Sequence, residues 1–316
     1  MTLVIDAQSL SRRFGSFKAV DGLDLAVERG EIFGLLGPNG AGKTTTIRML
    51  ATLLSPSSGH VSVCGFDVIK DPKQVRKRIG YVMQQIATNR YYLTGRECVQ
   101  MEASLYHVPR HEVPARAEQA LDVVGLLPFA DKRFPTYSGG MQKRLDIACG
   151  LLHKPELLIL DEPTLGLDVQ SRHHIWEHIF DLQRQGVTIL LATNYLDEAD
   201  RLCNRISIID HGSVVVAGSP RELKRGVGAD VVTVGTAEVP RLQGLIAGEP
   251  WVTRIAAAED GGLHVYVVDA STAVPAVMRI AVDNNIELDR VTYSQPSLDD
   301  VFLMHTGREL REGDAA

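Results

Sequence analysis

A glycine-rich stretch ending in lysine and threonine carries the residues of this chain best suited to chemistry. It has the spacing G-x-x-x-x-G-K-T plus one further threonine and consists of Gly37, Pro38, Asn39, Gly40, Ala41, Gly42, Lys43, Thr44 and Thr45. Glycines let backbone N–H groups turn inward around a polyphosphate, where a Cβ would intrude. Lys43 can then neutralise the β- and γ-phosphates, and the Thr44 hydroxyl can ligate Mg²⁺. The stretch therefore predicts a nucleotide site.

An acidic pair supplies a second reactive group. Asp161 and Glu162 directly follow the apolar run Leu157–Leu160. Beside a phosphate loop, Asp161 can hold Mg²⁺ directly or through water, and Glu162 can orient or deprotonate an attacking water. Alone, the pair could also belong to a strand with acidic residues at its exposed end. The phosphate loop favours the interpretation as a hydrolytic site.

A serine and two glycines form a third polar group. Ser138, Gly139 and Gly140 precede a helix-like run, Gln142–Leu152. Ser138 can cap this helix, whose first backbone N–H groups then form an anion site.

The elements around these groups predict a parallel sheet. An apolar, strand-like run, Glu31–Leu36, leads into the phosphate loop, and a helix follows it and stops near residues 55–59. The buried-strand patterns Leu157–Leu160 and Val187–Leu191 are separated by a helical stretch, Ser171–Gln185. Near-continuous apolar strands separated by helices indicate a parallel sheet covered on both faces.

The remaining segments predict a helical region and a second domain. Residues before Leu36 form short β-rich runs, residues 93–124 are mainly helical with a break near 108–109, and residues 224–228 resemble a hinge. Beyond the hinge we expect strand 231–234, helix 239–246, strand 252–257, strand 263–268, helix 272–283, strand 288–293 and a helix capped by Ser297. This βαββαβ order predicts a small ferredoxin-like domain.

Bulk composition narrows the class of protein. A chain of 316 residues suits two domains, and 45% hydrophobic with 23% charged residues is ordinary for a soluble protein. The formal net charge of −6 gives no support to a nucleic-acid partner. No apolar run approaches the roughly 18–20 residues that span a bilayer, and Met1–Leu10 lacks the pattern of a signal peptide. Any membrane pore is therefore expected in another chain.

Cysteines and histidines offer little further chemistry. Cys64, Cys98, Cys149 and Cys203 are far apart, and we expect buried, reduced thiols of a cytosolic protein. His174 and His178 have a spacing that can hold a metal, but without a third ligand nearby a solvated helix face is favoured.

The order of these motifs resembles that of the ATP-binding-cassette (ABC) ATPases. Ser-Gly-Gly-x-Gln, from Ser138 to Gln142, stands ahead of the acidic strand and well after the phosphate loop, as in that family's signature. The resemblance covers residues 3–223 and implies an ABC cassette of the P-loop NTPase class, an α/β fold with a mixed sheet core and a helical subdomain at about residues 90–140. It also implies ATP and Mg²⁺ as ligands. In the family the signature of one subunit closes over the γ-phosphate held by the other, so a second cassette, expected to be a copy of this chain, is implied.

Further positions match in order. Phe14 stands where the family places an aromatic against adenine, although it would also suit plain core. Gln84 matches the glutamine that contacts Mg²⁺ and couples to the membrane partner, and Asp168 matches a loop that communicates between the two sites.

One position departs from the family pattern. Most cassettes place a histidine near the γ-phosphate after the last core strand, whereas this chain has Asn194. Asparagine can donate a hydrogen bond but carries no positive charge. The resemblance is closest to the daunorubicin-resistance type of bacterial exporter ATPase, whose members often have an amide here. We therefore expect Asn194 to position the γ-phosphate as a neutral donor.

The C-terminal part supports the same subgroup. Gln295–Phe302 and Thr306–Leu310 are similar to the tail motif of these exporter ATPases. This tail suits either a capped helix docked on its own domain or a device for dimer stabilisation or regulation. We expect domains at residues 1–224, the ATP-binding cassette, and 229–316, the accessory domain.

The resemblance implies the ATP-hydrolysing subunit of an exporter. It would lie on the cytoplasmic face of the cell membrane, bound to a separate permease, and power efflux of a hydrophobic drug, antibiotic or lipid. Two alternatives remain: a non-hydrolysing regulatory cassette, which Asn194 favours, and a soluble ribosome-associated ABC ATPase, which the single cassette and the acidic charge disfavour.

Overall fold

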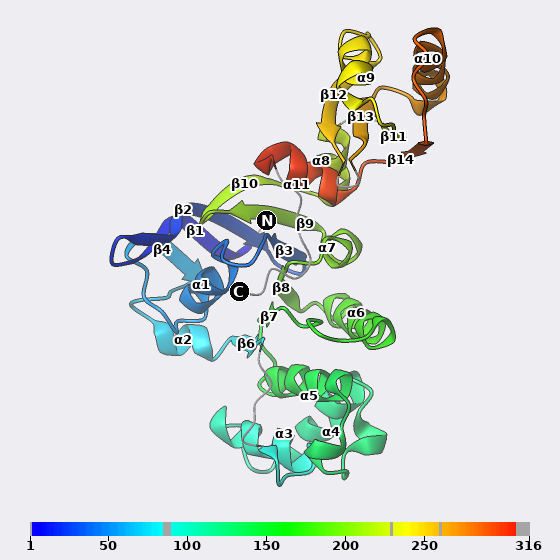
Figure 1. Ribbon diagram of the computed structural model, residues 1–316. Helices are drawn as coiled ribbons and strands as arrows, with labels where there is room; N and C mark the ends of the chain where they lie inside the picture. Colours follow the sequence, from blue (N-terminus) through cyan, green and yellow to red (C-terminus); the bar gives the residue numbers. More distant parts are fainter. Residues whose placement is uncertain (1, 85–89, 228–229, 259–260, 308–316) are drawn as a thin grey trace. The chain divides into compact units, whose positions relative to one another are not determined.

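The computed structural model describes residues 2–84, 90–227, 230–258 and 261–307. The chain folds into two compact units that divide between Ser219 and Pro220. Figure 1 labels most of the helices and strands of both units.

A six-stranded sheet forms the centre of the first unit. Its order is β10-β9-β3-β8-β7-β6. The strands are β3 (Ile32–Leu36), β6 (Ile79–Val82), β7 (Leu157–Asp161), β8 (Thr188–Thr193), β9 (Arg205–Asp210) and β10 (Ser213–Gly218). All neighbouring pairs are parallel except β9 with β10. Every residue of β3, β7 and β8 is buried, because both faces of the sheet are covered, as the apolar runs predict.

A second, antiparallel sheet comes from the β-rich N-terminal segment. Its order is β2-β1-β4-β5, and the strands are β1 (Leu3–Phe14), β2 (Phe17–Glu28), β4 (Ser58–Val63) and β5 (Phe66–Asp67). Alternate residues of β2 are buried, as expected for a sheet with one face in the core. The mixed sheet architecture predicted for the cassette is confirmed.

The helices of the first unit fall into two groups. Around the sheets lie α1 (Lys43–Leu50), α2 (Pro72–Arg76), α6 (Val169–Arg184) and α7 (Leu196–Leu202). A helical group comprises α3 (Gly95–Leu105), α4 (Val113–Val123), the short 3₁₀ helices η2 (Leu127–Phe129) and η3 (Phe134–Thr136), and α5 (Gly139–Leu151). Figure 1 shows α3, α4 and α5 gathered beyond strand β6, and α5 packs against both other helices and against β6.

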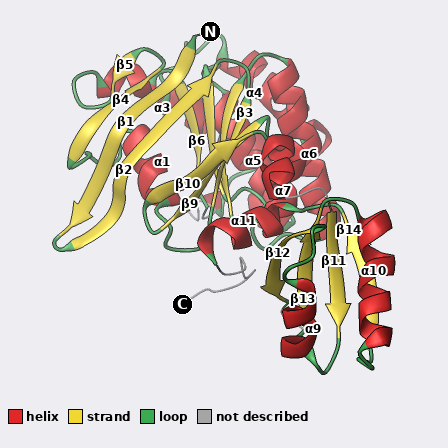
Figure 2. Cartoon of the chain, turned by 90° about the horizontal axis from the view of Figure 1, so that it is seen from above, coloured by secondary structure: helices red, strands yellow, loops and turns green. Residues whose placement is uncertain are grey.

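The second unit has the expected βαββαβ order. Its elements are α8 (Pro220–Val227), β11 (Asp230–Gly235), α9 (Val239–Ile246), β12 (Val252–Ala257), β13 (Leu263–Val267), α10 (Ala270–Asp283), β14 (Arg290–Ser294) and α11 (Leu298–Thr306). The strands form one antiparallel sheet in the order β12-β13-β11-β14, as in a ferredoxin-like fold, with α9 and α10 beside it (Figure 2).

Helix α11 docks on this same unit. Ser297 caps it in a reciprocal capping box with Asp300, as predicted, and Leu298, Val301 and Phe302 are buried. The Tyr266 hydroxyl of β13 donates to Asp300 Oδ1 at 2.8 Å.

The division between the units differs from the expected end of the first domain at residue 224. Residues 224–227 of the predicted hinge form the end of α8, which packs against α11. Pro220 suits a first helical position, and Lys224 and Arg225 suit the negative end of a helix dipole. Gly228 lies outside the described residues.

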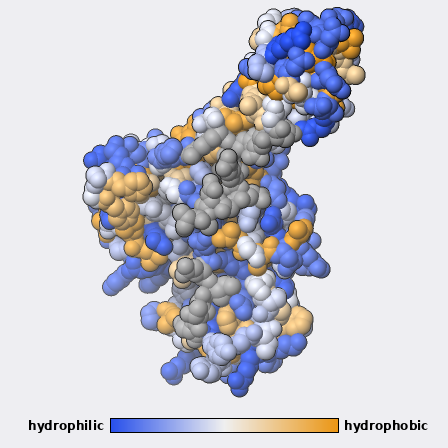
Figure 3. Space-filling model, viewed as in Figure 1, coloured by the Kyte–Doolittle hydropathy of each residue, from blue (hydrophilic) through white to orange (hydrophobic). Residues whose placement is uncertain are grey.

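Figure 3 shows hydrophilic side chains over most of the visible face, with apolar ones in smaller groups. Among the helices of the described residues, none is long and apolar enough to cross a bilayer.

Candidate active site

Neighbouring parallel strands bring the predicted site residues to one edge of the six-stranded sheet. Leu36 of β3 pairs with Thr193 of β8, so Gly37 and Asn194 follow at the same level. On the other side of β8, Asp161 of β7 pairs with Ala192, and Val82 of β6 lies beside Leu160. The carboxyl ends of β3, β8, β7 and β6 therefore carry the phosphate loop, Asn194, Glu162 and Gln84 next to one another.

The phosphate loop requires glycine at two positions. A Cβ on Gly37 would lie 2.2 Å from the Ile209 carbonyl oxygen. Gly42 has φ +105°, and a Cβ there would lie 2.5 Å from the Ala19 carbonyl oxygen. Both the close approach and the left-handed backbone exclude larger residues. The loop passes directly into α1, so the N-terminal N–H groups of that helix face the loop.

A hollow of about 240 Å³ lies in front of this loop. It is lined by Phe17, Ala19, Pro38, Asn39, Gly40, Gly42, Lys43, Thr44, Thr45, Gln84 and Glu162. The phosphate loop, Glu162 and Gln84 thus share one space, of a size suited to a nucleotide polyphosphate.

Glu162 lies at the centre of a polar chain. Its Oε1 is 3.6 Å from Lys43 Nζ, and its Oε2 accepts a hydrogen bond of 2.8 Å from Gln84 Nε2. Lys43 Nζ also donates to the carbonyl oxygens of Gly37 at 2.6 Å and Pro38 at 3.1 Å. Burial lowers the pKa of Lys43, partly offset by Glu162 and Asp161. Glu162 has φ +49°, a left-handed conformation that costs a non-glycine residue free energy and often marks functional sites.

Asp161 and Thr44 form an oxygen-rich pair. The Thr44 hydroxyl donates to Asp161 Oδ1 at 3.3 Å. Burial, and then the charge of Glu162, raise the pKa of Asp161, because its negative charge is poorly solvated. A carboxylate and a hydroxyl are hard oxygen ligands, and a divalent cation would favour the charged form of Asp161. These residues therefore fit Mg²⁺.

Asn194 is buried at the end of β8, with 7% of its surface exposed. Its Oδ1 is buried without a hydrogen-bond partner in the described part of the chain. An unsatisfied buried amide oxygen is costly, and such groups often have a functional explanation.

The residues of the predicted signature lie outside the hollow. Ser138 caps α5, accepting from Met141 N at 3.3 Å, and Gln142 Nε2 donates to the Tyr137 carbonyl oxygen at 3.2 Å. Asp168 caps α6 by accepting from Ser171 N at 2.8 Å, which lowers the pKa of its carboxyl. The residues lining the hollow include none of Ser138, Gly139, Gly140, Gln142 and Asp168. Ser138, Gly139 and Asp168 are exposed, so they are accessible to a partner.

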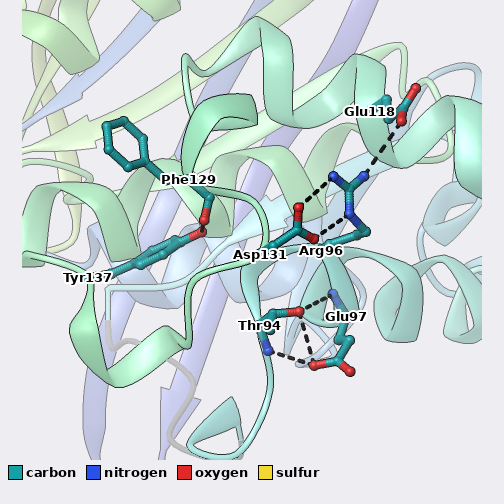
Figure 4. Close-up of polar contacts among 7 residues, drawn as sticks. All are labelled: Thr94, Arg96, Glu97, Glu118, Phe129, Asp131 and Tyr137. Carbon is teal, nitrogen blue, oxygen red and sulfur yellow. Dashed lines mark hydrogen bonds and ion pairs between the residues drawn. The ribbon is translucent and has the colours of Figure 1, made fainter.

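Polar contacts hold the chain just before the signature in place (Figure 4). The Tyr137 hydroxyl donates to the Phe129 carbonyl oxygen at 2.8 Å, and Arg96 of α3 contacts both oxygens of Asp131. Gly95 must lack a side chain, because a Cβ would lie 2.1 Å from the Tyr137 hydroxyl. The signature segment is thus fastened to the start of α3.

The aromatic candidate is not core. Phe14 is 47% exposed, with the Arg12 guanidinium 4.6 Å from its ring centroid. Phe17, its partner across the β1–β2 hairpin, is the aromatic that lines the hollow. Sequence reasoning missed Phe17; two aromatics flanking the tight turn Gly15-Ser16 were a signal that either ring lies near the nucleotide.

The histidine and cysteine residues stay outside this site. His174 is exposed and lies 3.6 Å from Glu177, and the described residues contain no cluster of three side chains suited to a metal. Cys98, Cys149 and Cys203 are buried free thiols, and Cys64 is half-buried.

Comparison with known proteins adds family information. A model of the ABC transporter family matches residues 20–165, and a model of the C-terminal domain of DrrA1-3-like ATP-binding proteins matches residues 218–306. The daunorubicin resistance ATP-binding protein DrrA2 of Streptomyces coeruleorubidus is 40% identical over 318 residues, covering 98% of this chain and 97% of that protein. The linearmycin resistance ATP-binding protein LnrL of Bacillus subtilis is 35% identical, covering 98% of this chain and 100% of that protein.

Solved structures show a similar fold. The ATP-binding subunit of an ABC transporter matches with a TM-score of 0.63 and 30% identity, covering 71% of this chain and 93% of that one. The dimeric structure of MJ0796, a bacterial ABC transporter cassette, matches with a TM-score of 0.61 and 26% identity, covering 68% and 98%.

Proposed function

Because the chain belongs to the family of ABC transporter ATPases with a DrrA-type C-terminal domain, we propose that it powers the efflux of a hydrophobic drug, antibiotic or lipid through a separate membrane permease. ABC ATPases bind and hydrolyse ATP. The relatives named for resistance to daunorubicin and linearmycin support a drug or antibiotic as the cargo. Binding to a permease would hold the chain on the cytoplasmic face of the cell membrane.

The observation that carries hydrolysis is the hydrogen-bonded position of Glu162 facing Lys43 in the hollow. Glu162 takes the proton from the attacking water, and Gln84 orients the carboxylate by donating to Oε2. Lys43 and the backbone N–H groups of the phosphate loop stabilise the charge on the transferred phosphoryl group. Thr44 and Asp161, with Gln84 beside them, would hold Mg²⁺, which neutralises charge on the phosphate oxygens when bound.

A second cassette completes the site in this proposal. Ser138 and Gly140 lie at the start of α5, away from the hollow of their own chain, and would act on a nucleotide held by a partner. The dimeric arrangement of MJ0796 supports two cassettes, and a second copy of this chain is the simplest partner. ATP binding would then close the dimer and hydrolysis would release it, which drives the permease between its states.

Asn194 favours one other function, a regulatory cassette that binds ATP without turnover. The intact pair Glu162–Gln84 argues against it.

The test is Mg²⁺-dependent ATP turnover by the purified chain and by Glu162→Gln. We expect clear turnover in the wild type and a loss of about 10²–10⁴-fold in the variant, with ATP binding retained. Glu177→Gln, an exposed glutamate of α6, serves as the control and should leave turnover unchanged. ATP binding without turnover in the wild type, and therefore in both variants, would favour the regulatory cassette.

A further inference from the structure

Lys143 is a buried cation whose described hydrogen bonds go to backbone oxygens. It lies on the second turn of α5 and is only 4% exposed. Its Nζ donates to the carbonyl oxygen of Met83 at 2.6 Å and to that of Gln84 at 3.3 Å. Burying an ammonium is costly, and here it lowers the pKa of Lys143. The buried ammonium does what an apolar side chain could not, because it donates to two backbone carbonyl oxygens.

The two carbonyl groups belong to the chain that positions the candidate base. Met83 and Gln84 directly follow β6, and the Gln84 side chain donates to Glu162 Oε2 at 2.8 Å. Lys143 is therefore two hydrogen bonds away from the Glu162 carboxylate. Because both bonds involve the same residue, moving the Gln84 backbone also moves its side-chain amide.

Helix α5 also holds the chain beyond residues 85–89, which are outside the described residues. Asp146, one turn after Lys143, accepts from the buried Arg90, which also pairs with Glu102 of α3 at 3.0 Å. The same helix thus contacts the chain on both sides of this segment. Its first turn is the signature, which Tyr137 ties to η2 (Figure 4).

We propose that Lys143 is a positioning residue that couples the signature helix α5 to Glu162 of the same chain, through the backbone and side chain of Gln84. The inference rests on the proposed function, because it assigns Glu162 the role of base. A nucleotide that contacts Ser138 and Gly140 from the partner's site displaces α5, and Lys143 passes that displacement to the hydrogen bond on Glu162. The site that binds nucleotide in trans is thereby linked to the chemistry performed in cis.

The experiment measures ATP binding and turnover of the full chain with Lys143→Met, Lys143→Arg and Arg144→Met. Methionine keeps the length of lysine but leaves two partly buried carbonyl groups without their donor. We expect Lys143→Met to lower kcat about tenfold or more, with the dissociation constant for ATP nearly unchanged, because the phosphate loop is intact. Arginine retains N–H donors and should recover part of the loss.

Arg144→Met is the matched control. Arg144 is the next residue of the same helix and also donates to a backbone carbonyl, that of Val124 at the end of α4, at 3.2 Å. Its loss should change kcat by less than about threefold. Equal losses in kcat for Lys143→Met and Arg144→Met would overturn the proposal, since they would reflect only the stability of α5.

A double-mutant cycle with Gln84→Ala distinguishes an effect of Lys143 that acts through Gln84 from a general loss of stability. If Lys143 acts through Gln84, Lys143→Met should change kcat by less than about twofold in the Gln84→Ala background. Fully additive losses would overturn the link.

Hydrogen exchange gives a readout that does not need turnover. Lys143→Met should speed amide exchange in the peptide that contains β6 and Gln84, whereas Arg144→Met should not. If the wild type hydrolyses no ATP, the proposed function fails. The exchange comparison still tests whether Lys143 holds Gln84 in place, because equal exchange in the two variants would overturn that contact's role.

Discussion

Asn194 occupies the position at which the resemblance to ABC ATPases leads us to expect a histidine in most cassettes. It follows β8 between the phosphate loop and the acidic pair, and its Oδ1 is buried without a partner among the described residues. At this position the Asn194 side chain can donate a hydrogen bond to the γ-phosphate through its amide NH₂ group. A neutral donor stabilises the developing charge less than an imidazolium does but retains direction.

We predict that Asn194→Ala lowers kcat by about 10²–10³-fold, because one transition-state hydrogen bond is lost. ATP affinity should change little, since Lys43 and the phosphate loop are untouched. Steady-state turnover and equilibrium binding of a fluorescent ATP analogue check the prediction. Turnover as fast as in the wild type would refute the role of Asn194 as a donor.

Glu198 shows how several elements share one buried carboxyl. It lies on α7 and its Oε1 accepts from the Thr164 hydroxyl at 2.8 Å and from Trp176 Nε1 of α6 at 2.9 Å. Thr164 belongs to the loop after β7 that carries Glu162. Burial raises the pKa of Glu198 above its ordinary value of 4.5, and its Oε2 has no partner in the described part of the chain. This carboxyl therefore fastens α6, α7 and the loop after β7 to one another.

We predict that Glu198→Gln makes stability less dependent on pH. A raised pKa means that the stability contributed by Glu198 is full below its ordinary pKa and is lost as pH rises through the folded-state pKa. Glutamine keeps the Oε1 acceptor and never ionises. As pH rises from about 5 to about 8, the free energy of unfolding of the variant should therefore increase relative to that of the wild type.

Thermal unfolding across this pH range measures the effect, with the exposed Glu177→Gln as control. A constant difference between the wild type and Glu198→Gln at every pH would contradict the raised pKa of Glu198.

At the scale of the whole molecule, the C-terminal unit raises the question of dimerisation. Helix α11 docks on its own unit through Tyr266 and three buried side chains, so the tail motif has a structural role. A role in dimer stabilisation remains a prediction. Because α8 packs against α11, a chain cut after Gly228 would keep α8 without its partner.

We predict that a chain ending at Ser219 binds ATP like the full chain but dimerises about tenfold more weakly, equivalent to about 1.4 kcal/mol. Solved cassettes of similar extent support independent folding of this unit. Light scattering of both chains in the Glu162→Gln background, with ATP, provides the measurement. An unchanged dimer would exclude a role of the C-terminal unit in dimerisation.

Local patterns in the sequence were sufficient to predict much of the fold and of the candidate site. Three kinds of feature could be predicted because each depends on residues that are neighbours in sequence. Glycines allow the tight backbone of the phosphate loop, and an apolar run marks the buried strand before the acidic pair. Ser138 and Ser297 cap α5 and α11 because their side chains accept from N–H groups that have no partner within the helix. The ferredoxin-like order of the second unit was predicted for the same reason. Short β4 and β5 and helix α2 were missed, and α1 ends at Leu50 rather than near 55–59, because such short elements and ends carry little periodicity.

Only the tertiary structure decided which of these groups meet. The parallel register of β3, β8, β7 and β6 places Gln84 against Glu162 and Asn194 beside the phosphate loop, although the residues are far apart in sequence. The tertiary structure also placed Phe17 among the residues that line the hollow, and the packing of α8 on α11 moved the division of the chain to Ser219. Lys143 reads in the sequence as one more basic residue on a helix. Its partners are backbone carbonyls on a distant strand end, which no local pattern encodes, because strand register and helix packing are set by the collective burial of the core.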